Sequence, residues 1–271
     1  MGETRRIRIG NQSAFSAETI TGPFEYAVAS GFDAFEWFPD KKASGAGWEE
    51  GDIDTKTRQY IKGTALEHDI RLSVHAPWHL NALESGMRER LLETLAFATD
   101  IGAALINIHL YADQGAQAYV RAIVPLIRPF AERGMRLSVE NTPLTGPREV
   151  NAFFDTLRAL EPEAMAQVGM CLDLGHANLC EGTRNDYLKF VDLLDPTIPI
   201  IHVHLHENFG DSDSHLVLFT GPAKEDVSGI KGFIDRLKER GFLGAIILEQ
   251  WPEKPALLKE ARNRLREIIG P

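Results

Sequence analysis

The feature of this sequence that most limits its fold is a repeated alternation of short β-rich runs with longer helical patterns. Eight short apolar runs follow one another along the chain, each of a length typical of a buried strand. The segments between several of them carry apolar residues at three- and four-residue spacing, which is typical of amphipathic helices. We expect strands at Arg6–Gly10, Ala34–Phe38, Arg71–His75, Leu105–Leu110, Arg136–Glu140, Val168–Asp173, Ile198–Leu205 and Ala245–Glu249.

The helical segments have recognisable start and stop signals. Gly134 and Gly241 follow two of the apolar patterns directly, and glycine is the usual residue just beyond a helix C-terminus. Pro147 and Pro255 lie where two further helices would begin, because proline is favoured in the first turn. We expect helices at Thr55–His68, Met87–Ile101, Tyr119–Arg133, Asp226–Arg240 and Ala256–Ile268, with another starting at Pro147.

Strands that alternate with helices predict βαβ units and a parallel sheet. Eight such units in 271 residues favour a single (β/α)8 TIM barrel that spans residues 1–271 as one domain. An open doubly wound sheet of the Rossmann type is the alternative. The first predicted strand is not followed by a G-x-G-x-x-G turn, which disfavours that alternative. Two long segments, Asp40–Asp52 and His206–Gly229, are expected to be functional loops.

Charge and cysteine content exclude several classes of protein. Twenty-nine basic and 39 acidic residues give a net charge of −10, which opposes non-specific binding to a polyanion. No apolar run approaches the ~18 residues of a membrane span, so we expect no membrane partner. The two cysteines, Cys171 and Cys180, form neither a disulfide framework nor a zinc ribbon. We expect a cytoplasmic globular protein with buried thiols, and a homo-oligomer stays open.

The ends of the predicted strands carry imidazoles and carboxylates, without a lysine base. In a barrel the reactive groups project from the C-terminal ends of the strands, so these side chains are expected to converge. Neutral imidazole and carboxylate are the usual ligands of Zn²⁺ and Mn²⁺. Gathered carboxylates repel one another in a dry cavity, and a divalent cation removes that repulsion. The expected metal ligands are His75, His109, Glu140, Asp173, His176, His204 and Glu249.

Two other histidines are expected to lie outside such a centre. His202 shares a strand face with His204 but lies one layer deeper, because residues two apart on a strand point the same way. We therefore expect His202 to be structural. His68 lies near the end of a predicted helix and is expected to be a surface group.

Taken in order, these strand ends resemble the xylose-isomerase-like TIM barrels. That superfamily includes endonuclease IV (AP endonuclease family 2) and many sugar isomerases and epimerases. The resemblance covers nearly the whole chain. It rests on the motifs Ser73-Val74-His75-Ala76-Pro77, Ile108-His109, Val139-Glu140-Asn141-Thr142, Asp173-Leu174-Gly175-His176-Ala177, Val203-His204-Leu205-His206-Glu207-Asn208, Asp213-Ser214-His215 and Leu248-Glu249.

The resemblance implies between one and three metal ions, either zinc or manganese. Endonuclease IV enzymes carry three zinc ions, and nine ligand positions of that pattern are present in this sequence. By motif, the first group is His75, His109 and Glu140, and the second is Glu140, Asp173, His204 and Glu249. The third group is His176, Asp213 and His215. Epimerases of the superfamily typically hold one metal at Glu140, Asp173, His204 and Glu249.

The first functional hypothesis is a metal-dependent sugar isomerase or epimerase. The substrate would be a small polyhydroxy molecule, a sugar or sugar phosphate, and a proton would move next to a metal-bound carbonyl. Glu140 and Glu249 are expected to be the catalytic acid and base. The residues expected to bind substrate are Glu36, Trp37, Trp78, Asn81, His206 and Trp251.

Two alternatives remain open from the sequence. The first is an endonuclease IV-like zinc phosphodiesterase that acts on abasic-site DNA, with paired metals that stabilise both oxygens of an in-line displacement. DNA is an expected partner under this alternative alone. The second is a binding module that kept the barrel and lost turnover, which the complete ligand sets disfavour.

Overall fold

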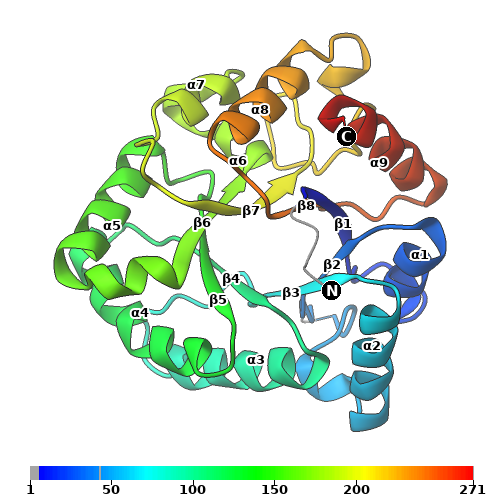
Figure 1. The fold of residues 1–271 in the computed structure, drawn as a ribbon, viewed down its shortest axis with the longest axis horizontal. Helices are drawn as coiled ribbons and strands as arrows, with labels where there is room; N and C mark the ends of the chain where they lie inside the picture. The colour runs from blue at the N-terminus through cyan, green and yellow to red at the C-terminus, as the bar shows by residue number, and fades with distance from the viewer. Residues whose placement is uncertain (1–5, 43, 271) are drawn as a thin grey trace.

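The computed structural model describes residues 6–42 and 44–270, and its strands close into one parallel barrel (Figure 1). Each strand pairs with the next, and β8 returns to pair with β1. The predicted (β/α)8 barrel is therefore confirmed, and the open doubly wound sheet is excluded. The strands are β1 (Arg8–Gln12), β2 (Ala34–Trp37), β3 (Arg71–His75), β4 (Leu105–His109), β5 (Arg136–Glu140), β6 (Val168–Asp173), β7 (Ile200–Leu205) and β8 (Ala245–Leu248).

Helices surround the barrel and cover its outer face (Figure 1). The α-helices are α1 (Gly22–Ser30), α2 (Thr55–Glu67), α3 (Met87–Ile101), α4 (Ala116–Ala131), α5 (Pro147–Leu160), α6 (Leu174–Leu179), α7 (Tyr187–Asp192), α8 (Ser228–Glu239) and α9 (Ala256–Ile269). Short 3₁₀ helices are η1 (Glu50–Asp52), η2 (Pro162–Ala166), η3 (Glu181–Thr183) and η4 (Pro222–Lys224). No helix in the described part of the chain has the length and apolar character needed to cross a bilayer.

Local signals fixed several helix ends as expected. α3 has the predicted bounds, and Gly102 ends it with a φ of 75°, a left-handed conformation that costs glycine little. Pro147 opens α5, as predicted. α1 was missed, because its nine residues are short and its apolar side chains, Phe24 and Ala27 among them, lack a strong period.

Two strand boundaries were wrong by two residues. β1 begins at Arg8 and runs to Gln12, because Gly10 to Gln12 pair with β2 and the strand needs that length to reach the rim. β7 begins at Ile200, since Ile198 lies in the preceding turn, where its N–H donates to Asp195. Both predicted boundaries followed apolar runs, whereas strand ends depend on pairing with neighbours.

The strand register sets which side chains meet at the C-terminal rim of the barrel. His109 pairs with Glu140 across β4 and β5, and Asp173 pairs with His204 across β6 and β7. Residues in register on neighbouring strands point to the same face, so these four side chains enter the barrel mouth together. Register therefore gathers, on one small surface, residues that lie far apart in the sequence.

Candidate metal centre

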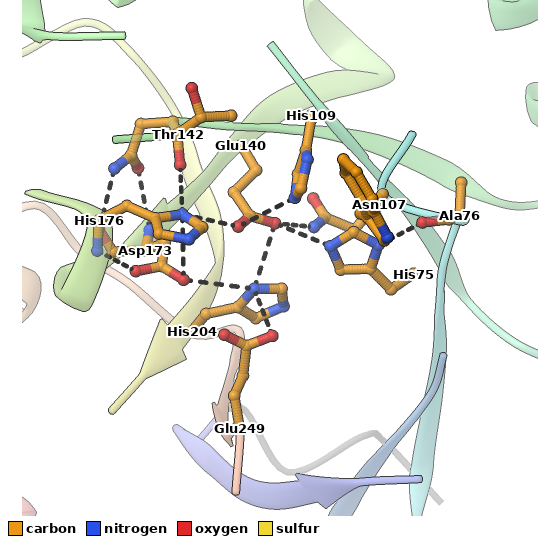
Figure 2. Close-up of polar contacts among 12 residues, drawn as sticks. His75, Ala76, Asn107, His109, Glu140, Thr142, Asp173, His176, His204 and Glu249 are labelled. Carbon is orange, nitrogen blue, oxygen red and sulfur yellow. Dashed lines mark hydrogen bonds and ion pairs between the residues drawn. The ribbon is translucent and has the colours of Figure 1, made fainter. Parts of the chain in front are cut away.

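The first predicted ligand group lies together at the ends of β3, β4 and β5 (Figure 2). The Nε2 atom of His75 is 3.2 Å from one carboxylate oxygen of Glu140, and that of His109 is 3.6 Å from the other. One donor atom from each of the three residues falls within a span of 4.8 Å. Asn107, two residues before His109, donates from its amide to Glu140 and holds the carboxylate in place.

The second predicted group shares Glu140 with the first. The Nδ1 atom of His204 is 3.2 Å from Glu140 and 3.1 Å from Glu249, which follows β8 directly. Asp173 lies farther away, 3.9 Å from the same nitrogen. Figure 2 shows these side chains converging from β5 to β8 on one point. Glu140 thus stands between two clusters of donors, where one carboxylate can serve both.

The third predicted group lies beside the second, partly in the loop after β7. The Nε2 atoms of His176 and His215 are each 3.3 Å from one oxygen of Asp213. Asp173 connects the groups, because it caps α6 and its carboxylate accepts a hydrogen bond from the backbone N–H of His176 at 2.6 Å. All nine sequence-predicted ligands therefore belong to one continuous cluster.

The imidazoles are oriented in the way that metal-binding histidines usually are. The Nδ1 atoms of His75, His176 and His215 contact the backbone carbonyls of Ala76, Asn141 and Glu249. Such a contact fixes the tautomer with the proton on Nδ1 and leaves Nε2 free as a donor atom. In all three residues Nε2 faces a carboxylate of the cluster. These residues therefore fit divalent metal ions.

The charges of the cluster also call for a cation. Burial alone would raise the pKa of Glu140, but His204 and His109 outweigh it and hold that pKa well below its ordinary value. Burial raises the pKa of Glu249 to about 8, and burial lowers the pKa of His109 to about 4. A neutral His109 beside an ionised Glu140 is the pair of protonation states that binds a metal.

Glu36 lies beneath the centre rather than in the substrate cavity, which corrects its predicted role. Its side chain is fully buried, accepts hydrogen bonds from Ser73 and His202 at 2.9 and 2.8 Å, and lies 2.7 Å from Nε2 of His204. A carboxylate on Nε2 turns Nδ1 of His204 toward Glu140 and Glu249. Glu36 is a positioning residue, and His202 is the deeper structural histidine that the sequence predicted.

We expect Glu36→Gln to weaken metal binding about 10–100-fold, because the amide no longer fixes the tautomer of His204. Isothermal titration with Zn²⁺ and Mn²⁺ measures the effect. Glu50→Gln is a matched control, because Glu50 is also buried but contacts Arg90 and Thr94 outside the centre. Equal metal affinities for the two variants would contradict this role for Glu36.

Glu36 also gives a pH dependence to the stability of the metal-free chain. Burial would raise the pKa of Glu36, but His204 and His202 outweigh it and hold that pKa well below its ordinary value of 4.5. The contribution of Glu36 to the free energy of unfolding is therefore present above about pH 4.5 and is lost as the pH falls below it. Urea unfolding from pH 7 to 3 should show the gap between wild type and Glu36→Gln shrinking.

A cavity of about 1320 Å³ opens above the centre and is lined by His75, His109, Glu140, His176 and Glu249. Three predicted substrate-binding residues, Trp78, Asn81 and Trp251, line it as well. Trp37 does not, because it lies in the core between barrel and helices, within 6.4 Å of Phe97 and 5.7 Å of Trp48 between ring centres. His206 is also buried below the cavity wall rather than on it.

Sequence reasoning missed two asparagines that support the ligands. Asn141 donates from its side chain to the carbonyl of Asp173 at 2.9 Å and accepts from the N–H of Asp173 at 2.9 Å. Asn107 holds Glu140 and accepts a hydrogen bond from Ser138 at 2.7 Å. The available signal was position, since each lies within two residues of a predicted ligand.

Comparison with known families agrees with this architecture. The family described as "Xylose isomerase-like TIM barrel" matches residues 24–268, which is most of the chain. The protein belongs to this family. The predicted resemblance is thereby confirmed at the level of the family, whose members share a barrel of the kind described above.

Individual relatives of this xylose isomerase-like barrel differ in what their names say they do. An uncharacterized protein of Methanocaldococcus jannaschii is 24% identical over 94% of this chain and 88% of its own length. A D-psicose 3-epimerase structure has a TM-score of 0.72 at 15% identity, covering 98% of this chain and 100% of its own. Endonuclease IV from Thermus thermophilus has a TM-score of 0.66 at 23% identity, covering 97% and 98%. These similarities show a shared fold.

Proposed function

We propose that this protein is a divalent-metal-dependent isomerase or epimerase that moves a proton next to the carbonyl of a small polyhydroxy substrate. The observation that carries this proposal is the charge of the cavity. Its described lining has no arginine and one lysine, beside six carboxylates from Asp40, Asp113, Glu140, Glu149, Asp213 and Glu249. An acidic mouth repels a polyanion such as DNA and accepts an uncharged sugar.

The single lysine of the described lining is already engaged. The ammonium of Lys42 lies 2.5 Å from Asp40 and 5.1 Å from the ring centre of Phe15. A phosphate group would have to displace Asp40 to reach it. This arrangement favours substrates without phosphate over sugar phosphates and phosphodiesters.

Aromatic and amide side chains surround the upper cavity. Trp78 and Phe15 are 54% and 53% exposed, so their faces are available to a ligand. Trp251 also lines the cavity and is held edge-on against Tyr26. Aromatic rings pack well against the apolar faces of sugars, and the amide of Asn81 can hydrogen-bond to hydroxyls.

Glu140 and Glu249 are the residues we assign to proton transfer. Both line the cavity, and both lie within 3.2 Å of the same His204 nitrogen, on strands that face each other across the mouth. One carboxylate can take a proton from substrate carbon while the other returns it. Their supports, Asn107 and His204, hold both groups at fixed positions.

A zinc or manganese ion bound by Glu140, Asp173, His204 and Glu249 would lower the cost of the negative charge that develops on substrate oxygen. The number of ions, between one and three, depends on whether the other two groups also load. The fit of these side chains to a metal rests on the orientation of the imidazoles and on the gathered buried carboxylates described above.

Exchange of substrate protons in D₂O tests the proposal directly. The metal-loaded protein is incubated with a panel of unphosphorylated ketoses and aldoses, and deuterium at carbon is followed by NMR. We expect exchange for at least one unphosphorylated sugar and slower exchange for its phosphorylated form. A panel without any exchange, with metal content verified, would refute the proposed function.

A phosphodiesterase is the second candidate, and the gathering of His176, Asp213 and His215 beside the other two groups favours it. Nicking of an abasic-site duplex by the fully zinc-loaded chain measures this activity. We expect no nicking above a metal-only control, because the acidic cavity lacks a free cation for the phosphate backbone among the residues described as lining it. Efficient nicking would replace the first proposal by the second.

A further inference from the structure

His206, two residues after His204, is buried without a hydrogen-bonding partner. Its side chain is 2% exposed, and neither ring nitrogen makes a hydrogen bond within the described part of the chain. A buried polar group usually has a partner, because leaving it unpaired costs about 1–3 kcal/mol. An unpaired imidazole inside a cluster of metal-ligand side chains needs a different explanation.

The position of His206 supplies that explanation. Its Nε2 atom lies 3.7 Å from Asp213 and 3.4 Å from Asp173. Its ring stacks on His215 with 3.9 Å between centres and a tilt of 9°. One donor atom each from His176, His206, Asp213 and His215 falls within 4.8 Å of the others. The orphaned nitrogen therefore points at the third ligand group.

These separations suit a four-donor zinc site. Donors around a tetrahedral zinc ion with bonds of about 2.0–2.1 Å lie about 3.3–3.4 Å apart. The two contacts of His176 and His215 with Asp213 are both 3.3 Å, and the contact of His206 with Asp213 is only slightly longer. We propose that His206 is a metal ligand, and that it completes a closed zinc site of three imidazoles and one carboxylate.

Gly175 gives independent support, because it makes room for the His206 ring. A Cβ atom at position 175 would lie 1.9 Å from Cε1 and 2.3 Å from Nε2 of His206. No side chain at this position is compatible with the imidazole where it now lies. Gly175 is the second residue of the short helix α6 and directly precedes His176, so the glycine seats one ligand beside the next.

The two parts of the centre would then prefer different metals. Glu140, Asp173, His204 and Glu249 offer three carboxylates and one imidazole, a set that suits manganese, whereas an imidazole-rich set suits zinc. A site closed by four protein ligands keeps no open position for substrate, unlike a catalytic site. The inference rests on the proposed function for the carboxylate-rich site and separates it from a neighbouring structural zinc.

Metal analysis of the whole chain tests the role of His206. The protein is loaded with Zn²⁺ and Mn²⁺ together, dialysed and assayed for both metals, and a Co²⁺-loaded sample gives visible spectra. We expect His206→Asn to lose one zinc per chain and the intense absorption of four-coordinate cobalt, and to keep its manganese. His68→Asn, which removes an exposed imidazole far from the centre, should match the wild type.

Gly175→Ala is the second variant, because it leaves every ligand in place and displaces only the ring of His206. Its retained manganese and its circular dichroism report whether the barrel is folded. We expect the same loss of one zinc. Unchanged zinc content and cobalt spectrum in His206→Asn would overturn the inference and leave proton exchange untouched. Absent exchange with the expected metal losses would overturn the function and leave the site of His206 standing.

Discussion

Replacing Glu140 by glutamine will lower proton exchange at substrate carbon by at least about 10³-fold. The carboxylate stands between two ligand groups and contacts His75, His109 and His204, so its loss removes both a metal ligand and the assigned base. The amide has nearly the same size, so the barrel itself should stay folded. Initial exchange rates at saturating metal measure the effect.

A surface glutamate provides the control for this prediction. Glu89 is exposed on α3, and Glu89→Gln should leave both exchange and metal content unchanged. Metal analysis of Glu140→Gln separates the two roles of the residue. Near wild-type exchange by this variant would show that proton transfer takes place elsewhere.

Removal of metal is expected to produce the second large effect, a strong loss of stability. Glu140, Asp173 and Glu249 are buried together, and their ion pairs among the described residues are all with histidines. A ligand at about 1,000 times its Kd stabilises a folded chain by about 4 kcal/mol. For a protein of this size, that corresponds to a fall in Tm of roughly 8–16 °C on chelation.

Scanning calorimetry of metal-loaded and chelator-treated protein measures this shift, and re-addition of metal should restore the Tm. Glu140→Gln serves as the comparison, because a chain that has lost a shared ligand should respond much less to the chelator. A Tm that stays constant through complete metal removal would show that the cluster does not bind metal in the folded state.

Much of the fold followed from local sequence. Each β-run is apolar on both faces because the strands lie between a filled interior and a layer of helices, so pattern alone located all eight. α1 escaped detection because its bounds depend on packing of Phe24 against Phe35 and Trp37 rather than on an apolar period.

The candidate site was less evenly predictable. Ligands at strand ends were accessible to sequence reasoning, because barrel geometry places strand C-termini at one rim. Glu36 and Trp37 were assigned to the substrate cavity because they are near the end of β2, but β2 ends one layer lower than the neighbouring ligands. Alternation along that strand sends Glu36 into the barrel and Trp37 into the outer core.

The order of residues along the chain determined the barrel and the kind of chemistry at its mouth, because strand period and residue type are local properties. Only the folded chain decided how the donors are shared out. The stacking of His206 on His215, the pairing of Lys42 with Asp40 and the support of His204 by Glu36 each depend on where loops and strands lie in space. Such contacts are set by register and loop path, which no local pattern encodes.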